Sequence, residues 1–226
     1  MTVQTIRARN TIAISPRYLR IKRVFDIVFT LLALPFLGVI VGIVAVAIRL
    51  NSKGPIFFRQ KRVGLHGVEF DMFKFRSMYH QCDDAPHRKS IEQYMANQPL
   101  NGNTGTINPQ YKLVDDPRVT RVGQFLRKTS IDELPQFINV LRGEMTLVGP
   151  RPPLLYEVER YNSHDWLRLC GRPGLTGTWQ VYGRGRVPFS TMVDMDIAYL
   201  QQQSLLEDFK LILLTFPIML RGTGGV

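Results

Sequence analysis

Two adjacent carboxylates, Asp132 and Glu133, stand in the part of the sequence best suited to chemistry, which reads Thr129-Ser130-Ile131-Asp132-Glu133-Leu134-Pro135-Gln136. Beside a phosphate group, one carboxylate can attack phosphorus and form an acyl-phosphate. The other can hold Mg²⁺, which prefers hard oxygen ligands and bridges to phosphates. A structural explanation stays open beside these two. Ser130-x-x-Glu133 has the form of a capping box at a helix start, where an acidic residue in the first turn is also stabilising.

Basic residues recur on both sides of this pair, several of them on turns rich in glycine and proline. They are found at Arg118, Arg121, Arg127 and Lys128, and in Gly149-Pro150-Arg151-Pro152, Arg172-Pro173-Gly174 and Gly183-Arg184-Gly185-Arg186. Rigid turns hold an arginine in place, and its planar guanidinium binds phosphate through two hydrogen bonds. Each arginine alone is an ordinary surface charge. Together they predict a phosphate-binding site around Asp132 and Glu133.

The overall charge agrees with an anionic ligand. The 226 residues carry a formal charge of +11, which indicates nucleic acid, an anionic membrane or phosphorylated substrates as partners. Two distant cysteines, Cys82 and Cys170, predict no disulfide framework. The four histidines show no metal-binding spacing, so we expect no histidine-ligated metal.

An apolar segment precedes all of these residues. The positions 27–48 contain no charged residue, and as a straight helix they are about 33 Å long, enough to cross a bilayer core. Basic residues flank both ends, at Arg17, Arg20, Lys22 and Arg23 and at Arg49, Lys53, Arg59, Lys61 and Arg62. Such clusters prefer the cytoplasmic side, and Pro35 is expected to kink or break the helix. The pattern therefore favours a re-entrant membrane helix over a spanning anchor.

Two further apolar features leave alternatives open. Gly38 and Gly42 form a G-x-x-x-G pattern, which favours local packing but keeps a homodimer open. The stretch 211–220 is apolar and too short to span a membrane. It is expected to form either a core helix or a helix in the membrane interface.

The remaining sequence predicts a small α/β or α+β domain. Residues 54–79 indicate a β-hairpin that turns between Gly64 and Gly67. Residues 81–116 predict a long mobile loop with a short helix near 90–97, which is either a lid or a surface insertion. Helices are expected near 132–141, 154–169 and 190–203. We divide the chain into a basic segment 1–21, a re-entrant helix 22–50 and a catalytic domain 51–226.

Several motifs in this order resemble the bacterial sugar transferase family, the monotopic phosphoglycosyl transferases. The resemblance runs from about Lys22 to the C-terminus. It rests on Lys22-Arg23-Val24-Phe25-Asp26, Lys74-Phe75-Arg76-Ser77-Met78, Asp116-Pro117-Arg118-Val119-Thr120-Arg121-Val122-Gly123, Arg127 through Pro135, Asn139 through Pro152, and Arg172-Pro173-Gly174-Leu175-Thr176-Gly177.

The resemblance implies an enzyme that moves a sugar-1-phosphate from a UDP-sugar to polyprenyl (undecaprenyl) phosphate, and we expect the transferred group to be a hexose-1-phosphate. It implies that Asp132 is the nucleophile, that Glu133 helps to bind Mg²⁺, and that UMP is released. Arg127, Arg151 and Arg184 match the family's arginines around the phosphates. Lys74 and Asp196 match polar positions of the family's site. The product would be an early membrane intermediate of exopolysaccharide, capsule, O-antigen or glycoprotein glycan synthesis.

The same resemblance implies a bacterial inner-membrane protein whose catalytic domain faces the cytoplasm, with membrane lipids as further partners. The sequence departs from the family where Leu34-Pro35 replaces the Ser-Pro pair of many members. With so short a segment before the apolar run, we expect the minimal catalytic form. A peripheral lipid-binding protein is the alternative, because it also explains the charge and the apolar run. A nucleic-acid partner is not expected, because nucleic-acid binding would explain the positive charge but not the apolar membrane segment.

Overall fold

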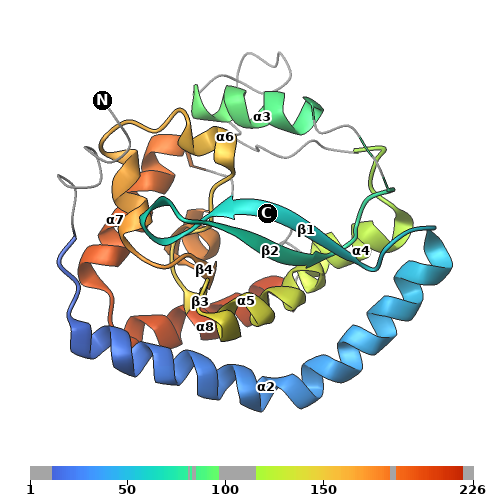
Figure 1. Cartoon of the computed structure of the whole chain (residues 1–226), viewed down its shortest axis with the longest axis horizontal. Coiled ribbons are helices and arrows are strands. Elements are labelled where there is room, and N and C mark those ends of the chain that lie inside the picture. The colour runs from blue at the N-terminus through green and yellow to red at the C-terminus, as the bar shows by residue number, and fades with distance from the viewer. Residues whose placement is uncertain (1–11, 81, 83–84, 97–115, 184–186, 221–226) are drawn as a thin grey trace.

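The computed structural model describes residues 12–80, 82, 85–96, 116–183 and 187–220. Figure 1 shows the order of the elements. The helices are α2 (Pro16–Asn51), α3 (Ala85–Met95), α4 (Arg121–Thr129), α5 (Phe137–Arg142), α6 (Leu155–Val158), α7 (Phe189–Gln202) and α8 (Leu205–Leu220). The strands are β1 (Phe57–Val63), β2 (Glu69–Phe75), β3 (Thr146–Val148) and β4 (Gly174–Thr176). Short 3₁₀ turns cover Leu65–Gly67, Ile131–Gln136 and Asp165–Cys170, and a π turn covers Trp179–Gly183.

The apolar segment forms a single helix, α2, that continues through Pro35. Figure 1 shows it bent in its middle part along one edge of the domain, so the proline is associated with a bend and not with an interruption. The helix is long and apolar enough to cross a membrane. The side chains of Leu32 and Phe36 are 70% and 75% exposed. Such exposure of large apolar groups is not typical of the core helix of a soluble protein.

The first turns of α2 are bound to the domain by buried polar contacts. The Lys22 ammonium lies 2.6 Å from the Asp208 carboxylate of α8, and both side chains are buried. Arg23 donates hydrogen bonds to the carbonyl oxygens of Val140 and Leu141 at the end of α5. Two of the basic flanking residues are therefore bound inside the fold, where they are not available to lipid headgroups.

The last turns of α2 contact the same domain through apolar packing. Val44 and Ile48 form a buried cluster with Phe75 of β2 and Leu126 of α4. Just past the helix end, the Arg76 guanidinium donates to the carbonyl oxygen and the hydroxyl of Ser52. Both ends of α2 thus lie against one and the same domain, while its middle part is exposed.

The predicted hairpin is confirmed. β1 and β2 are antiparallel, with Phe57 opposite Phe75 and Val63 opposite Glu69, and the turn is the 3₁₀ segment Leu65–Gly67. On β2, Phe70, Met72 and Phe75 are buried. Phe70 and Met72 on one face of β2 belong to the main core, whereas Phe75 on the other face packs against α2 and α4, so both faces of this strand are covered.

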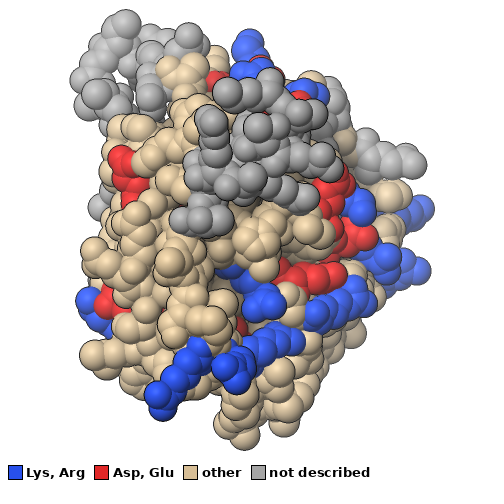
Figure 2. All heavy atoms as spheres, turned by 60° about the vertical axis from the view of Figure 1, so that its left-hand side comes forward, with Lys and Arg blue, Asp and Glu red and all other residues tan. Residues whose placement is uncertain are grey.

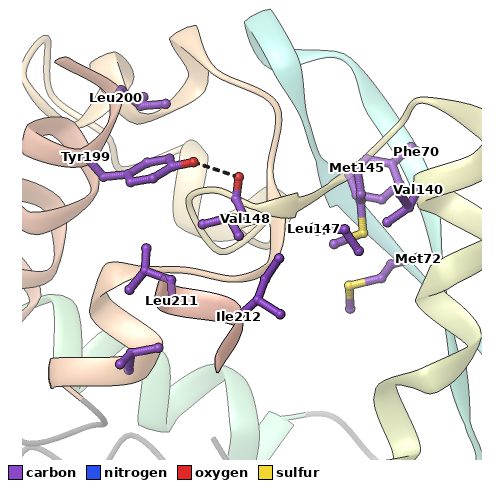
Figure 3. Packing of buried hydrophobic residues seen from close by; sticks show 11 residues of the cluster. Phe70, Met72, Val140, Met145, Leu147, Val148, Tyr199, Leu200, Leu211 and Ile212 are labelled. Atoms are coloured by element: carbon purple, nitrogen blue, oxygen red, sulfur yellow. Dashed lines mark hydrogen bonds between the residues drawn. The ribbon is translucent and has the colours of Figure 1, made fainter. Parts of the chain in front are cut away.

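The main core lies between the hairpin, the short parallel pair β3–β4 and helix α8. Thr146 is opposite Gly174 and Val148 is opposite Thr176 in the parallel pair. Figure 3 shows Met145 and Leu147 between the hairpin side chains and those of α8, with Leu211 and Ile212 pointing inward. The Tyr199 hydroxyl donates to the Val148 carbonyl oxygen at 3.0 Å, which ties α7 to β3.

The other predicted helices are confirmed in part. The helix expected at 190–203 is α7, and the one expected near 90–97 begins earlier, as α3. The helix expected at 154–169 is instead two short pieces, α6 and the turn Asp165–Cys170. The stretch 211–220 belongs to α8, which contacts the core on one face, and the alternative of a helix in the membrane interface stays a prediction. Leu211 and Ile212 are buried in the core, whereas Leu213 and Phe216 are exposed.

The glycine pattern of α2 does not serve packing within the described residues. A Cβ atom placed on Gly38 or Gly42 would meet nothing within 4 Å. The expected local packing is therefore wrong for this part of the chain, and the homodimer stays a prediction.

Candidate functional site

The carboxylate pair lies on a 3₁₀ turn and not on the α-helix expected at 132–141. Asp132 and Glu133 belong to the turn Ile131–Gln136, and α5 begins only after it. Pro135 has no N–H to donate to the residue four positions earlier, which disfavours an α-helix here. Ser130 has a left-handed backbone, with a φ of 57°, and its side chain makes no cap hydrogen bond. The capping-box interpretation is therefore wrong, and the side chain of Glu133 is engaged elsewhere.

Glu133 is bound by a lysine from the hairpin. The Lys74 ammonium of β2 lies 2.7 Å from Glu133 Oε1. Both side chains are largely buried, at 14% and 20% exposure, so solvent screens this ion pair less than a surface pair. The structure thus brings together two residues that are 59 positions apart in the sequence.

The Asp132 side chain, in contrast, lines a cavity of about 500 Å³ between the hairpin, α3 and α4. The side chain is mostly buried, with 8% exposure. The cavity is lined by many cationic groups, namely Arg59, Arg62, Lys74, Arg76, Arg118, Arg127 and Arg151. Its volume lies in the range of small-molecule sites, and its charge suits a ligand with several negative charges. Figure 2 shows Lys and Arg side chains also gathered on the outer surface, in a band above an uncharged region.

Arg151 is held by the close packing of two glycine turns, as the sequence predicted for the Gly149-Pro150-Arg151 motif. The Gly149 N–H donates to the Thr176 carbonyl oxygen, and the Gly174 N–H donates to that of Pro150. A Cβ atom on Gly174 would collide with the Gly149 nitrogen. Only glycine therefore allows this approach, which fixes the backbone beside Arg151.

The other predicted site residues have different positions. Arg127 lies in the last turn of α4 and lines the cationic cavity with Lys74 and Asp132. Arg184 lies outside the described residues. Asp196 is buried, at 2% exposure, and accepts hydrogen bonds from Arg168 in an ion pair of 2.6 Å.

Asp196 is therefore not a residue that lines the cationic cavity. Arg168, its partner, also donates to the Arg151 carbonyl oxygen at 3.3 Å. Asp196 is linked to Arg151 through this bridge, and its predicted role in substrate binding stays a prediction. Burial raises the pKa of its carboxyl, and the Arg168 guanidinium opposes that shift.

Arg62 and His87 line the cavity but were not predicted for the site, whereas Arg118 belongs to the basic residues expected around the phosphates. Arg62, read as a membrane flank, is buried and donates to the Pro152 carbonyl oxygen. Arg118 is bound to Asp116, 2.7 Å away. His87 of α3 also lines the cavity. Neither Arg62 nor His87 has a sequence signal for the site, because Arg62 belongs to the basic flank of the apolar segment and His87 lies in none of the quoted motifs.

A second cavity of about 250 Å³ is lined by Glu133 of the carboxylate pair and is mostly apolar. Phe29, Ala33 and Leu37 of α2 line one side, and residues of α8 line another. Glu133 and Arg151 supply charged groups to this groove. Arg151 lines both cavities, so it marks the place where they meet.

Asp132 and Glu133 are the carboxylates of the site that could bind a metal ion. The described residues contain no group of three or more His, Cys, Asp or Glu side chains that could hold a metal ion. Mg²⁺ does not require such a group, because it is usually bound by one or two carboxylates together with substrate phosphates and waters. Asp132 and Glu133 therefore fit an ion that arrives with a phosphorylated substrate, and they do not fit a permanent metal centre.

A helix with an exposed apolar middle beside a cationic cavity with a carboxylate in its wall is typical of a membrane-associated protein, and the cavity suits an anionic ligand. The family model of the bacterial sugar transferases matches residues 17–222 of this chain. This chain belongs to that family. Two features that carried the resemblance, the carboxylate pair and the Gly149–Pro152 turn, are the ones that the structure brings together.

Three relatives illustrate the similarity. The chain is 40% identical over 229 residues to the galactosyl transferase CpsE of Streptococcus agalactiae, covering 99% of this chain and 48% of the relative. It is 39% identical over 204 residues to the exopolysaccharide production protein ExoY of Sinorhizobium fredii, covering 90% and 87%. It is 38% identical over 224 residues to the undecaprenyl-phosphate galactose phosphotransferase of Salmonella typhimurium, covering 99% and 45%. The chain thus spans less than half the length of two of these relatives.

Proposed function

We propose that the protein transfers a sugar-1-phosphate from a UDP-sugar to polyprenyl phosphate, through a covalent intermediate on Asp132. The observation that carries this proposal is the meeting of two cavities of opposite character at the carboxylate pair. The cationic cavity suits the diphosphate of a nucleotide sugar. The apolar groove beside α2 suits an isoprenoid chain whose phosphate lies near Arg151.

The chemistry has two displacements at one phosphorus atom. A carboxylate oxygen of Asp132 attacks the β-phosphorus of the UDP-sugar, the bond from this phosphorus to the bridging oxygen breaks, and UMP leaves with the electron pair. A phosphate oxygen of the acceptor then attacks the same phosphorus and displaces the Asp132 carboxylate. The product is a polyprenyl diphosphate sugar. A covalent intermediate allows one site to serve a soluble donor first and a lipid acceptor second.

The other charged residues have supporting roles in this proposal. Arg127 and Arg151 bind the phosphates and stabilise the negative charge that develops at phosphorus. Lys74 orients Glu133, whose carboxylate is the candidate ligand for a Mg²⁺ ion bound with the substrate. Such an ion would neutralise phosphate charge during the transfer. Arg184 is proposed to join them on the strength of the sequence motif alone.

We further propose that α2 enters the membrane and returns on the same side. A helix that spans a bilayer places its ends on opposite sides, yet both ends of α2 contact one domain. The bend at its middle and the exposed apolar side chains there support a re-entrant segment. The catalytic domain would then face the cytoplasm, where nucleotide sugars are made available to it.

UMP release tests the function. The purified protein is incubated with Mg²⁺, undecaprenyl phosphate and a panel of UDP-hexoses and UDP-N-acetylhexosamines, beside the variant Asp132→Asn. We expect UMP from one donor in the wild type and none in the variant, with a phosphosugar trapped on the protein when the acceptor is left out. UMP release that survives Asp132→Asn would remove the covalent role of Asp132. The proposed transferred group is hexose-1-phosphate. The name of one relative, the exopolysaccharide production protein ExoY, refers to exopolysaccharide production.

A further inference from the structure

Helix α3 brings a histidine to the cationic cavity from the segment between β2 and α4. His87 lines the cavity together with Asp132, Arg127 and Arg151. Its ring nitrogen Nδ1 lies 3.1 Å from the Tyr156 hydroxyl of α6. The sequence predicted that this segment is a lid or a tolerated insertion, and no role follows for His87 from the family motifs quoted above.

The helix that carries His87 is packed firmly on the domain. Ile91 and Tyr94 are buried in a cluster with Tyr161 and Phe189. The Tyr94 hydroxyl donates to the Val187 carbonyl oxygen at 3.1 Å, and Glu92 pairs with Arg160 of the same domain. A helix with these contacts is a fixed wall of the cavity, so it can position a ligand-binding side chain.

The surroundings of His87 keep its imidazole neutral. Burial and the nearby guanidinium groups of Arg62, Arg118, Arg127 and Arg151 lower its pKa to about 4. The same cavity is also lined by the cationic side chains of Arg59, Lys74 and Arg76, by the imidazole of His80 and by the carboxylate of Asp132. An anionic ligand would cancel much of this positive field, and a protonated imidazole would then be favoured because both its nitrogens can donate hydrogen bonds.

We propose that His87 is a donor-binding residue, which α3 places in the cationic cavity to contact the diphosphate of the nucleotide sugar. This inference rests on the proposed function for the identity of the ligand. The histidine is neutral in the empty site and takes up a proton when the diphosphate binds. It thereby adds a cation only when an anion is present to receive it.

Binding of UDP, measured by calorimetry in buffers of different ionisation enthalpy, tests this role without requiring turnover. We expect the wild type to take up protons on binding UDP at neutral pH. His87→Gln and His87→Phe should lose that uptake and bind UDP about tenfold or more weakly, the range for a hydrogen bond to a charged group. Lys89→Ala, on the exposed side of the same helix, serves as the matched control and should behave as wild type.

Turnover provides the second readout. The two His87 variants should raise the KM for the UDP-sugar and leave the KM for polyprenyl phosphate unchanged, and their donor KM should lose its rise with pH. UDP affinity within twofold of wild type in both variants, with proton uptake retained, would overturn the inference. UDP binding with His87-dependent proton uptake but no UMP release from any donor would uphold it and overturn the proposed transferase. Melting temperatures close to wild type exclude a loss of α3 packing as the cause.

Discussion

The Lys74 ammonium lies 2.7 Å from Glu133 Oε1 and thereby joins the hairpin to the turn that carries both carboxylates. The pair has a structural and an electrostatic consequence. It fixes the direction of the Glu133 side chain, and it leaves Asp132, on the neighbouring position, facing the cationic cavity. The hairpin is therefore part of the site, because its strand β2 determines which carboxylate is held and which one faces the ligand.

This contact predicts coupled effects on catalysis. Lys74→Met and Glu133→Gln should each lower kcat/KM for UMP release by roughly 10- to 100-fold, because each removes one partner of a mostly buried ion pair. The double variant should lose less than the product of the two single effects, since the coupling energy of contacting residues is about 0.5–3 kcal/mol. Lys61→Met, which removes an exposed pair with Asp71 on the same hairpin, is the control. Fully additive losses would show that the two residues act independently.

The attachment of α2 predicts an effect on stability. Asp208→Ala would leave the Lys22 ammonium buried without its carboxylate, and Tyr18 and Tyr199, which also donate to Asp208, would lose an acceptor. Removing one partner of a buried ion pair typically lowers the free energy of unfolding by about 3–5 kcal/mol. The melting temperature in detergent or nanodiscs measures the loss. The variant Lys22→Met/Asp208→Leu should recover much of it, and a melting temperature of Asp208→Ala equal to wild type would contradict the proposed attachment.

The sequence predicted the hairpin, α7, the apolar helix and the charged site because each has a local signature. Alternation on 70–75, the apolar run and the glycine turns around Arg151 depend only on neighbouring residues. The sequence did not predict the contacts of Asp196 and Arg62, because these contacts join residues that are distant in the sequence. Asp196 matched a polar motif position, yet its partner Arg168 lies 28 positions away. Arg62 belongs to the basic flank of the helix, yet the fold buries it against Pro152, 90 positions away.

The 3₁₀ turn under the carboxylates shows a second limit. Apolar periodicity over 132–141 indicates a helix, and it does not distinguish an α-helix from a 3₁₀ turn that leads into one. The left-handed backbone of Ser130 is unusual for a residue other than glycine. This residue joins α4 to the turn, and the two elements pack against each other, a contact that the local sequence does not reveal.

His87 predicts how stability depends on pH. Its pKa is about 4 in the folded protein and about 6.5 in an unfolded chain. Between these values the unfolded chain binds more protons, so the free energy of unfolding falls as the pH is lowered from about 6.5 to about 4, and this contribution is constant above that window. The loss from this residue is at most about 3 kcal/mol. His87→Phe should flatten the decline of the melting temperature with falling pH, whereas an unchanged decline would place the acid sensitivity elsewhere.

The apolar groove predicts a defect in the second displacement only. Ala33 lines the groove from α2, and Ala33→Trp would fill space that the proposed isoprenoid chain needs. Formation of the phosphosugar on Asp132 and the single UMP released with it should stay at the wild-type level, because the donor uses the other cavity. Transfer to undecaprenyl phosphate should slow by tenfold or more. Val39→Trp, on an exposed face of the same helix with 66% exposure, is the control for any general effect of a large residue on membrane insertion. Equal transfer rates in the two variants would remove the groove from the acceptor site, and loss of the covalent intermediate in Ala33→Trp would show that the two cavities do not act separately.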